Sequence, residues 1–354
     1  MLRMDFIRSK VDPCLYYRPT PTSGGDFLFV AVFVDDLVIS CSCLQQIAMF
    51  KRQLEDNYDM KDLGPLEYCL GIKISRDSSG RITLNQSKYI DDVMARFGLQ
   101  NAHSEPTPMK QGLKLTKAMS PTTPDDIAKC AKFPYREIVG SLMYLMISTR
   151  PDIAYAVGQL SMFLNNAGPE HHAAALHLLR YCKGSKDLSI TYSPNTSLSV
   201  LGYSDADWAA CLDTRRSVTA YVFFAAGGPV SWKSKLQPTV ALSSTEAEYM
   251  ALTAAAQEAC SLRFLQQEFR VLSDSPVLIY EDNKGAIAMS VNPTLHKTSK
   301  HISIKQHFIR EAVQNGDVCL EYIPTDAMLA DALTKALSKV IFLKLRDKLL
   351  GLRV

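Results

Sequence analysis

The sequence predicts an α/β fold, in the broad sense that includes α+β proteins, divided over more than one domain. In the C-terminal part, three strand-like segments are followed by alternating helix-like and strand-like segments, which is typical of a mixed sheet covered by helices. The length of 354 residues favours two or three domains over a single core. Hydrophobic residues make up 47% of the chain and charged residues 21%, so ordinary globular cores are expected.

The composition also indicates which classes of protein are disfavoured and which cellular compartment is expected. Nine cysteines are scattered without a CxxC pair, which argues against a zinc site and suits a reducing compartment. The net charge of +3 permits nucleic-acid binding without demanding it. The apolar run at 27–34 is too short to cross a bilayer, and no signal-peptide core follows the first residues. We therefore expect an intracellular protein that has no membrane partner.

The N-terminal part begins with a predicted buried hairpin at 26–40. Two apolar, β-rich runs flank Asp35 and Asp36, which places these acids at the turn. The elements expected next are a helix at 45–60 and strands at 66–75 and 81–84.

A proline-rich stretch at 107–134 then predicts a connector, because it holds four prolines among Ser, Thr and Lys. Residues 135–183 have a helical pattern that is broken before Pro151 and Pro169. The turn-forming residues 193–195 mark a second boundary.

The C-terminal part is where the mixed sheet is expected. Its elements are predicted as strands at 199–205, 218–226 and 229–234, a long helix at 244–269, a strand at 277–281, helices at 284–291 and 303–315, a strand at 318–323 and a helix at 326–337.

Two acids stand out at the start of this part. Asp205 and Asp207 lie on one face of their strand because strand side chains alternate. In the long helix, the capping box that ends at Glu246 predicts a structural role for that residue. Glu248 instead heads an apolar stripe that should face the sheet, where a carboxylate is costly unless its charge is compensated.

Two further acids follow in the chain. Asp282 ends a continuous apolar strand, and ligands gather at such strand ends, although a helix cap is the simpler interpretation. Asp331 lies in the last predicted helix and by itself would be a solvated acid. Together with Asp205 and Glu248, these carboxylates suit Mg²⁺ or Mn²⁺. Two such ions can activate a water and stabilise the leaving oxygen of a phosphodiester.

With these residues in view, the C-terminal part resembles the RNase H domain of copia-type retrotransposons. The stretches that carry the resemblance are 202–208, 231–235, 243–249, 281–283, 301–302, 307–311 and 330–335. The resemblance implies metal-dependent endonucleolytic cleavage of the RNA strand in RNA–DNA hybrids. It assigns the catalytic and metal-binding roles to Asp205, Glu248, Asp282 and Asp331. A nucleic-acid-binding face is expected to include Trp232, Lys233 and Lys235, with a core position as the alternative for Trp232.

The first half resembles the reverse transcriptase of the same elements. Phe33-Val34-Asp35-Asp36 is similar to the YVDD box of the palm, which makes both acids expected metal ligands. Segments 63–72, 86–90 and 135–153 resemble the family's segments after the palm. The implied parts are a truncated palm and following region at 1–106, a connector at 107–134, a helical thumb or connection region at 135–193, an RNase H-like domain at 194–340 and a C-terminal tail at 341–354.

The sequence also departs from the family pattern. The third palm carboxylate and the fingers are expected upstream of Met1, so we expect that this chain alone does not polymerise DNA and that the upstream polyprotein is a partner. Leu176, His177 and Thr298 replace usual basic residues, and Ser303 replaces an acid. A catalytically silent relic that at most binds nucleic acid is therefore the alternative to an active RNase H. A transposase is disfavoured by the order of the acids. The resemblance implies a cytoplasmic virus-like particle or the nucleus.

Overall fold

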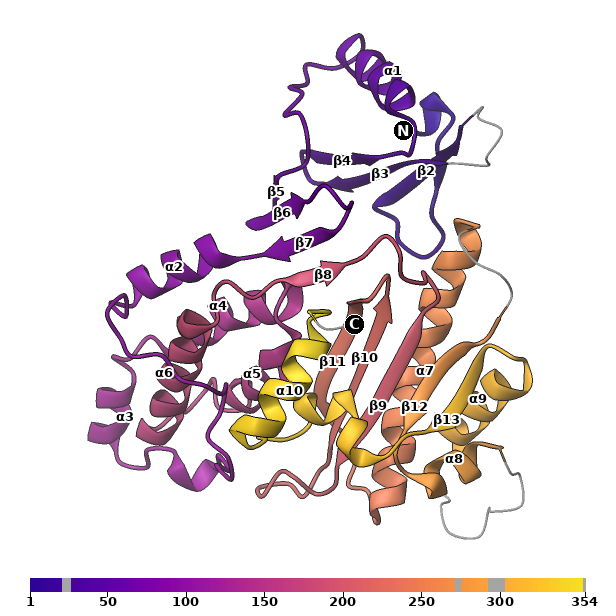
Figure 1. Cartoon of the computed structure of the whole chain (residues 1–354). Helices are drawn as coiled ribbons and strands as arrows, with labels where there is room; N and C mark the ends of the chain where they lie inside the picture. Colours follow the sequence, from indigo (N-terminus) through magenta and orange to yellow (C-terminus); the bar gives the residue numbers. More distant parts are fainter. Residues whose placement is uncertain (21–26, 271–274, 292–302, 353–354) are drawn as a thin grey trace. The chain divides into compact units, whose positions relative to one another are not determined.

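The computed structural model describes residues 1–20, 27–270, 275–291 and 303–352, without the side chains of 303–307 (Figure 1). Contacts divide the chain into two compact units. The first is Met1–Glu67 with Ser261–Asp274, and the second is Tyr68–Cys260 with Ser275–Val354. The functional boundaries that the sequence predicts stay a prediction.

The first unit is built around a four-stranded antiparallel sheet. Its strands, in spatial order, are β1 (Ile7–Arg8), β2 (Leu15–Pro19), β3 (Phe27–Phe33) and β4 (Asp36–Ser40), followed in the chain by helix α1 (Leu44–Glu55). The predicted hairpin is confirmed, since Phe33 pairs with Asp36 across the turn.

The hairpin is fully buried on one face only, which corrects the expectation of a buried hairpin. Leu28 and Val30 of β3 are fully buried in one cluster with Phe50 of α1. Side chains alternate along a strand, and on the other face of β3 Phe29 is half-buried with its ring centre 4.9 Å from that of Phe269, whereas Ala31 is exposed. At the turn, Phe33 is 56% exposed and Val34 is 82% exposed.

The second unit begins with another four-stranded antiparallel sheet. Its strands are β5 (Tyr68–Cys69), β6 (Ile72–Arg76), β7 (Ile82–Asn85) and β8 (Ile190–Tyr192). The strand expected at 66–75 is split because Leu70 and Gly71 turn the chain with φ of 49° and 71°. β8 was not predicted, since its pairing with β7 joins segments about a hundred residues apart and leaves no local signal.

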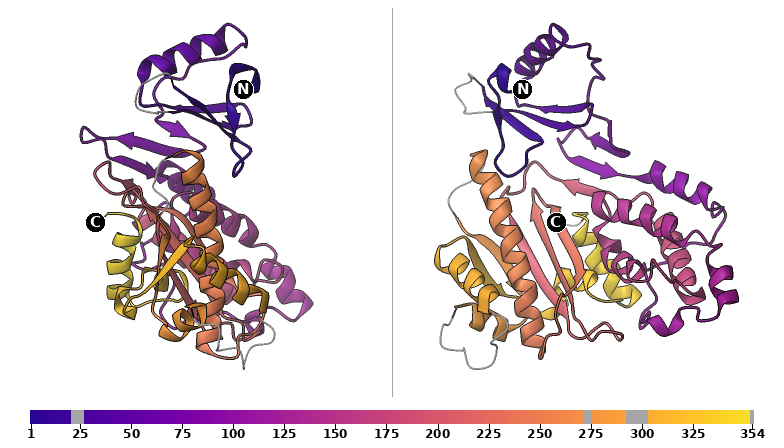
Figure 2. Two further views of the ribbon diagram at one scale, coloured as in Figure 1. Left: turned by 90° about the vertical axis from the view of Figure 1, so that its right-hand side faces the viewer. Right: turned by 180° about the vertical axis from the view of Figure 1, so that it is seen from behind.

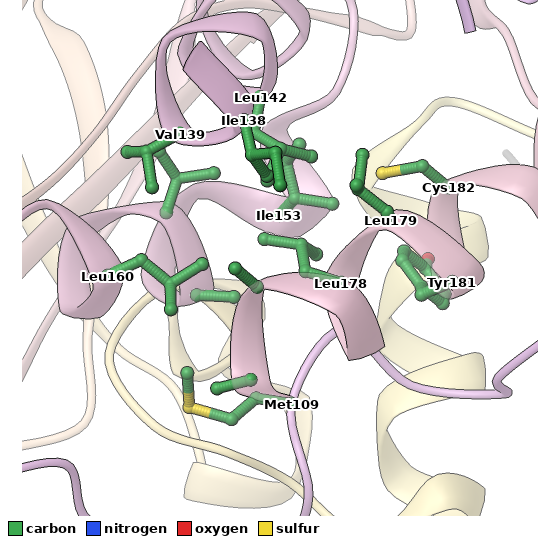
Figure 3. Packing of buried hydrophobic residues seen from close by; sticks show 14 of the residues in the cluster. Met109, Ile138, Val139, Leu142, Ile153, Leu160, Leu178, Leu179, Tyr181 and Cys182 are labelled. Carbon is green, nitrogen blue, oxygen red and sulfur yellow. The ribbon is translucent and has the colours of Figure 1, made fainter. Parts of the chain in front are cut away.

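Helices form the next layer of this unit. They are α2 (Ser87–Arg96), α3 (Pro124–Cys130), α4 (Tyr135–Ser148), α5 (Ala154–Ser161) and α6 (Pro169–Gly184). The predicted breaks before Pro151 and Pro169 are confirmed. The proline-rich stretch contains α3, which has Pro124 in its first turn and the Thr123 hydroxyl as its cap. The buried side chains of α2, α4, α5 and α6, among them Leu142, Leu160 and Leu178, pack into one core (Figure 3).

A five-stranded mixed sheet is the centre of the second unit. Its strands are β9 (Leu201–Asp207), β10 (Val218–Ala225), β11 (Gly228–Leu236), β12 (Val277–Glu281) and β13 (Val318–Tyr322). The spatial order is β11-β10-β9-β12-β13, with the first three antiparallel and β9, β12 and β13 mutually parallel. This confirms the predicted α/β class and the mixed five-stranded sheet.

Helices flank both faces of this sheet. Helix α7 (Ser244–Glu268) lies across one face, as the view from behind shows (Figure 2). On the other face α5, the 3₁₀-helix η6 (Leu329–Leu333) and α10 (Lys339–Leu349) share an apolar cluster with β10. Helices α8 (Lys284–Val291) and α9 (Ser303–Gln314) accompany β12 and β13.

The C-terminal end differs from expectation. The helix predicted at 326–337 is replaced by two short 3₁₀-helices, η5 (Thr325–Ala327) and η6. All five residues of η6 are buried, so no exposed stripe exists to support a longer amphipathic helix. Within the expected tail, α10 buries Phe342, Leu345 and Leu349.

Candidate metal centre

Three of the four predicted acids meet at one end of the mixed sheet. Oxygen atoms of Asp205, Glu248 and Asp282 lie within 4.8 Å of one another, and among the described residues they are the sole group of three His, Cys, Asp or Glu side chains gathered in this way. Asp205 is 3% exposed and Glu248 7% exposed, while Asp282 is half-buried. The predicted convergence is confirmed, whereas the role of these residues as ligands stays a prediction.

Strand pairing explains why Asp205 and Asp282 meet. β12 runs parallel to β9 with Tyr280 opposite Tyr203, so Asp282 continues at the level of Asp205. The alternative role of Asp282 as a helix cap belongs instead to Asn283, whose Oδ1 accepts a hydrogen bond from the amide of Ala286 at 3.0 Å. Asp282 is therefore available to the acid group.

The first turn of α7 separates its two acids as expected. Glu246 caps the helix, because its Oε2 accepts from the amide of Leu242 at 2.7 Å and its own amide donates to Ser243 Oγ at 3.1 Å. Glu248 faces the sheet, and its buried Oε2 has no hydrogen-bond partner among the described residues. The capping-box and stripe predictions are both confirmed.

Asp331 lies beside this group without being one of the three. It is 6% exposed in η6, so the alternative of a solvated acid does not hold, and its metal-binding role stays a prediction. Its Oδ1 lies 2.7 Å from the ammonium of Lys335. Its electrostatic influence nevertheless reaches Asp205.

Burial and mutual repulsion raise the pKa values of Asp205 and Glu248. Burial and the charge of Asp331 raise the pKa of Asp205 to about 7, although Lys335 and the Thr334 hydroxyl act in the opposite direction. Burial and the neighbouring Asp205 raise the pKa of Glu248 to about 11. An all-oxygen donor set with an unsatisfied buried oxygen fits a hard divalent cation, whose charge would favour the ionised carboxylates.

A fifth acid was missed in the sequence. Glu281 is fully buried, and its Oε1 accepts from the amide of Asn283 at 3.2 Å. Burial and the nearby Asp205 raise its pKa well above the usual value. The alternation of Val277, Ile279 and Glu281 along β12 was the signal that this side chain points inward.

The remaining predicted acids lie elsewhere. Asp207 is half-buried at the end of β9, where its Oδ2 lies 3.5 Å from the ammonium of Lys114. Asp35 and Asp36 lie in the first unit, at the hairpin turn, and both are exposed. Their metal-binding role stays a prediction.

The predicted nucleic-acid-binding residues do not share one face of the sheet. The Trp232 indole donates to the carbonyl of Met146 at 2.9 Å and packs against the apolar cluster that contains η6. Lys233 is exposed and its ammonium lies 5.8 Å from the ring centre of Tyr221. Lys235, two residues further along β11, shares the face of Lys233 and is also exposed.

The substituted basic positions are only partly described. His177 is 6% exposed, with its Nε2 at 2.9 Å from the carbonyl of Thr107, and Leu176 packs at the edge of the helical core. Thr298 and His301 lie outside the described residues, as does the side chain of Ser303.

Comparison with known proteins adds a sequence relationship to this geometry. The family model for reverse transcriptase (RNA-dependent DNA polymerase) matches residues 1–111. The chain is 40% identical, over 99% of its length, to the retrovirus-related Pol polyprotein from transposon TNT 1-94 of Nicotiana tabacum. It is 36% identical, also over 99% of its length, to the Pol polyprotein from transposon RE1 of Arabidopsis thaliana. It spans 26% and 23% of the lengths of these two relatives.

A solved structure also matches. The crystal structure of RNase H1 from the halophilic archaeon Halobacterium salinarum NRC-1 aligns with 38% of this chain and 94% of its own, at 17% identity and a TM-score of 0.29. Within the described residues, no helix combines the length and the apolar character needed to cross a membrane.

Proposed function

Since the chain belongs to the copia-type family of retrotransposon Pol polyproteins, we propose that residues 194–340 form an RNase H that cuts the RNA strand of RNA–DNA hybrids. The observation that carries this proposal is the meeting of Asp205, Glu248 and Asp282 within 4.8 Å, from a strand, a helix and the residue that follows a second strand. A stable fold would not crowd buried carboxylates in this way without a compensating cation or protons.

In the proposed site three of the acids share one role and the fourth has another. Asp205, Glu248 and Asp282 would hold Mg²⁺ or Mn²⁺, and Asp331 would stand beside them. Divalent cations, when bound, supply charge stabilisation for phosphodiester cleavage. The parallel pairing of β9 and β12 sets Asp282, just after β12, level with Asp205, while α7 brings Glu248 to them. The protein thereby fixes the carboxylates before the substrate arrives.

The test is a pair of measurements on the purified chain. Calorimetric titration with Mn²⁺ should show binding, and an RNA–DNA hybrid should be cut with Mg²⁺ and left intact with EDTA. Asp282→Asn should lower the cleavage rate by more than about 100-fold, since losing only an outer-shell partner of a metal ligand typically costs ~10–100-fold. Its melting temperature in EDTA should not fall.

The matched control is Glu246→Gln, at a neighbouring acid that caps the helix, because glutamine also completes a capping box. This variant should bind Mn²⁺ and cleave the hybrid as the unaltered chain does. An Asp282→Asn variant with full activity would refute the assignment of the site.

A silent relic is the second candidate, and one observation favours it. His177 stands where the family usually has a basic residue, and its side chain is buried against the carbonyl of Thr107. It therefore does not extend into solvent, where a lysine or arginine could contact phosphate. A chain that binds Mn²⁺ and the hybrid but does not cut RNA would support this candidate.

The substrate, the partner and the location of the chain are also part of the proposal. Its substrate would be an RNA–DNA hybrid, and its partner would be the upstream part of the same polyprotein, within a cytoplasmic virus-like particle. These assignments rest on the family, because the chain spans only about a quarter of its relatives. The functional boundaries at 106, 134, 193 and 340 are part of the same proposal.

A further inference from the structure

A segment after β13 reaches three of the four acids with polar side chains. We call residues 325–335 the donor segment. Its contacts are Thr325 Oγ1 donating to Asp282 Oδ2 at 2.6 Å, Thr334 Oγ1 donating to Asp205 Oδ2, and Lys335 Nζ lying 2.7 Å from Asp331 Oδ1. Each of these three acids therefore has its own donor from the donor segment.

The Thr334 contact is the most buried of the three. Thr334 is fully buried and Asp205 is 3% exposed. The preceding residue, Leu333, belongs to the apolar cluster on that face of the sheet, so little water competes for the hydroxyl. When Asp205 is ionised, as cation binding requires, a hydrogen bond in such surroundings fixes its carboxylate strongly.

A purely local role for Thr334 is the competing explanation. Its hydroxyl also lies 3.3 Å from the carbonyl of Asp331, a contact that closes the turn at the end of η6. A hydroxyl has one proton to donate, and the contact with Asp205 is the shorter one. The hydroxyl of Thr334 therefore donates its proton to the Asp205 carboxylate and not to the carbonyl that closes the turn.

Lys335 contributes a positive charge beside Asp331, whereas Thr334 contributes a directed hydrogen bond to Asp205. Burial lowers the pKa of its ammonium, but the charges of Asp205 and Asp331 outweigh burial and raise it. The Lys335 side chain is 36% exposed, so water screens this pair more than the pair of Thr334 and Asp205. Lys335 thus holds Asp331 in place beside the group of three without enclosing it.

We propose that Thr325 and Thr334 are positioning residues of the metal centre, which orient Asp282 and Asp205 for cation binding. The inference rests on the proposed function, because it requires that these acids hold a divalent cation. A carboxylate whose one oxygen is held by a donor has fewer orientations to lose when its other oxygen binds a cation. Removing a donor should therefore weaken cation binding while the acids themselves remain.

The experiment compares two substitutions at each threonine. Thr334→Val keeps the shape of the side chain and removes the hydroxyl, whereas Thr334→Ser keeps the hydroxyl. Calorimetric titration of the full chain with Mn²⁺ should show about 10–100-fold weaker binding for Thr334→Val and near-normal binding for Thr334→Ser. A role limited to packing would give the reverse order, because valine preserves the packing better than serine.

Thr325 provides a second arm that does not depend on the core. Thr325 is exposed, so Thr325→Val should fold normally even if Thr334→Val does not. It should weaken Mn²⁺ binding, and Thr325→Ser should restore it. Melting temperatures measured in EDTA identify any variant that has lost its fold.

The outcomes separate this inference from the proposed function. Normal Mn²⁺ binding by Thr334→Val and Thr325→Val, with binding lost in Asp282→Asn, would overturn the positioning role and leave the metal centre standing. An unaltered chain that does not bind Mn²⁺ would overturn both. Weakened binding in both valine variants, rescued by both serine variants, would support the inference.

Discussion

The two tryptophans of the chain differ in their surroundings. Trp208 follows Asp207 at the end of β9; it is 48% exposed, and its indole donates to the carbonyl of Ala241 at 3.0 Å. Trp232 donates to the carbonyl of Met146 and packs against the core. An exposed and anchored indole three residues from Asp205 is better placed than Trp232 to stack on a nucleic-acid strand.

We therefore expect Trp208 to report substrate binding. Adding an RNA–DNA hybrid in EDTA should change the tryptophan fluorescence of the unaltered chain, because stacking alters the surroundings of the indole. The change should vanish in Trp208→Phe and persist in Trp232→Phe. A fluorescence change that survives Trp208→Phe would assign the contact to another residue.

The raised pKa of Asp205 leads to a pH prediction. A carboxyl group whose pKa is higher in the folded chain stabilises the fold below its unfolded pKa, and this stabilisation is lost as the pH rises through the folded value. For Asp205 the window runs from about 4, the ordinary value, to about 7. Asp205→Asn should therefore gain melting temperature relative to the unaltered chain across this window.

The measurement is thermal unfolding in EDTA at several pH values. The histidines of α6, whose pKa values burial lowers, are identical in both proteins, so the difference reports Asp205 together with Glu248 and Glu281, whose pKa values its charge raises. Adding Mg²⁺ should reduce the advantage of Asp205→Asn near pH 7, because the ion binds only the folded carboxylates. A difference that stays constant from pH 4 to 7 would contradict the raised pKa.

Between elements, one buried ion pair ties the helical layer together. Arg150, before the 3₁₀-helix η3 (Pro151–Ile153), makes two hydrogen bonds of 2.8 Å to Asp152. Tyr181 and Ser185, at the end of α6, complete the network. Arg150 and Asp152 are each 1% exposed, so the pair has almost no access to water.

Asp152→Asn should destabilise the chain by about 3–5 kcal/mol, because it leaves the Arg150 charge buried and uncompensated. The matched control is Asp91→Asn, which removes a surface pair of 2.9 Å with Lys186 and should change stability by less than about 1 kcal/mol. Urea unfolding monitored by circular dichroism distinguishes the two. Equal effects of both substitutions would show that burial of the pair does not matter.

For the whole molecule, the small net charge of +3 makes local clusters of lysine decisive for nucleic-acid binding. Lys233 and Lys235 are exposed on one face of β11. We expect hybrid affinity to fall as salt rises, because phosphate contacts release counterions. A double substitution of these lysines by glutamine should reduce the logarithmic salt slope by about 0.9 for each phosphate that the lysines neutralise.

Fluorescence anisotropy of a labelled hybrid between 50 and 200 mM salt, roughly the range over which such contacts weaken, measures this slope. Lys186→Gln serves as the control, because Lys186 is already paired with Asp91. If the double variant and the control have the same slope as the unaltered chain, the phosphate-binding residues lie elsewhere.

The sequence by itself determined most of the elements and predicted the three acids that converge. Periodicity separated the strands of the mixed sheet from α7, and prolines marked the ends of α4 and the start of α6. The capping box distinguished Glu246 from Glu248 because both capping and the apolar stripe are local patterns. These signals depend on neighbours a few residues away, which is why they can be predicted from the sequence.

Only the tertiary structure decided which residues meet. The register between β9 and β12 places Asp205, and not Asp207, beside Asp282. Asn283, and not Asp282, caps the helix that follows. The short helices after β13 brought Thr334 to Asp205 across 129 positions of the chain. No periodic pattern encodes such pairings, because they arise when packing fixes the distance between segments that are far apart in sequence.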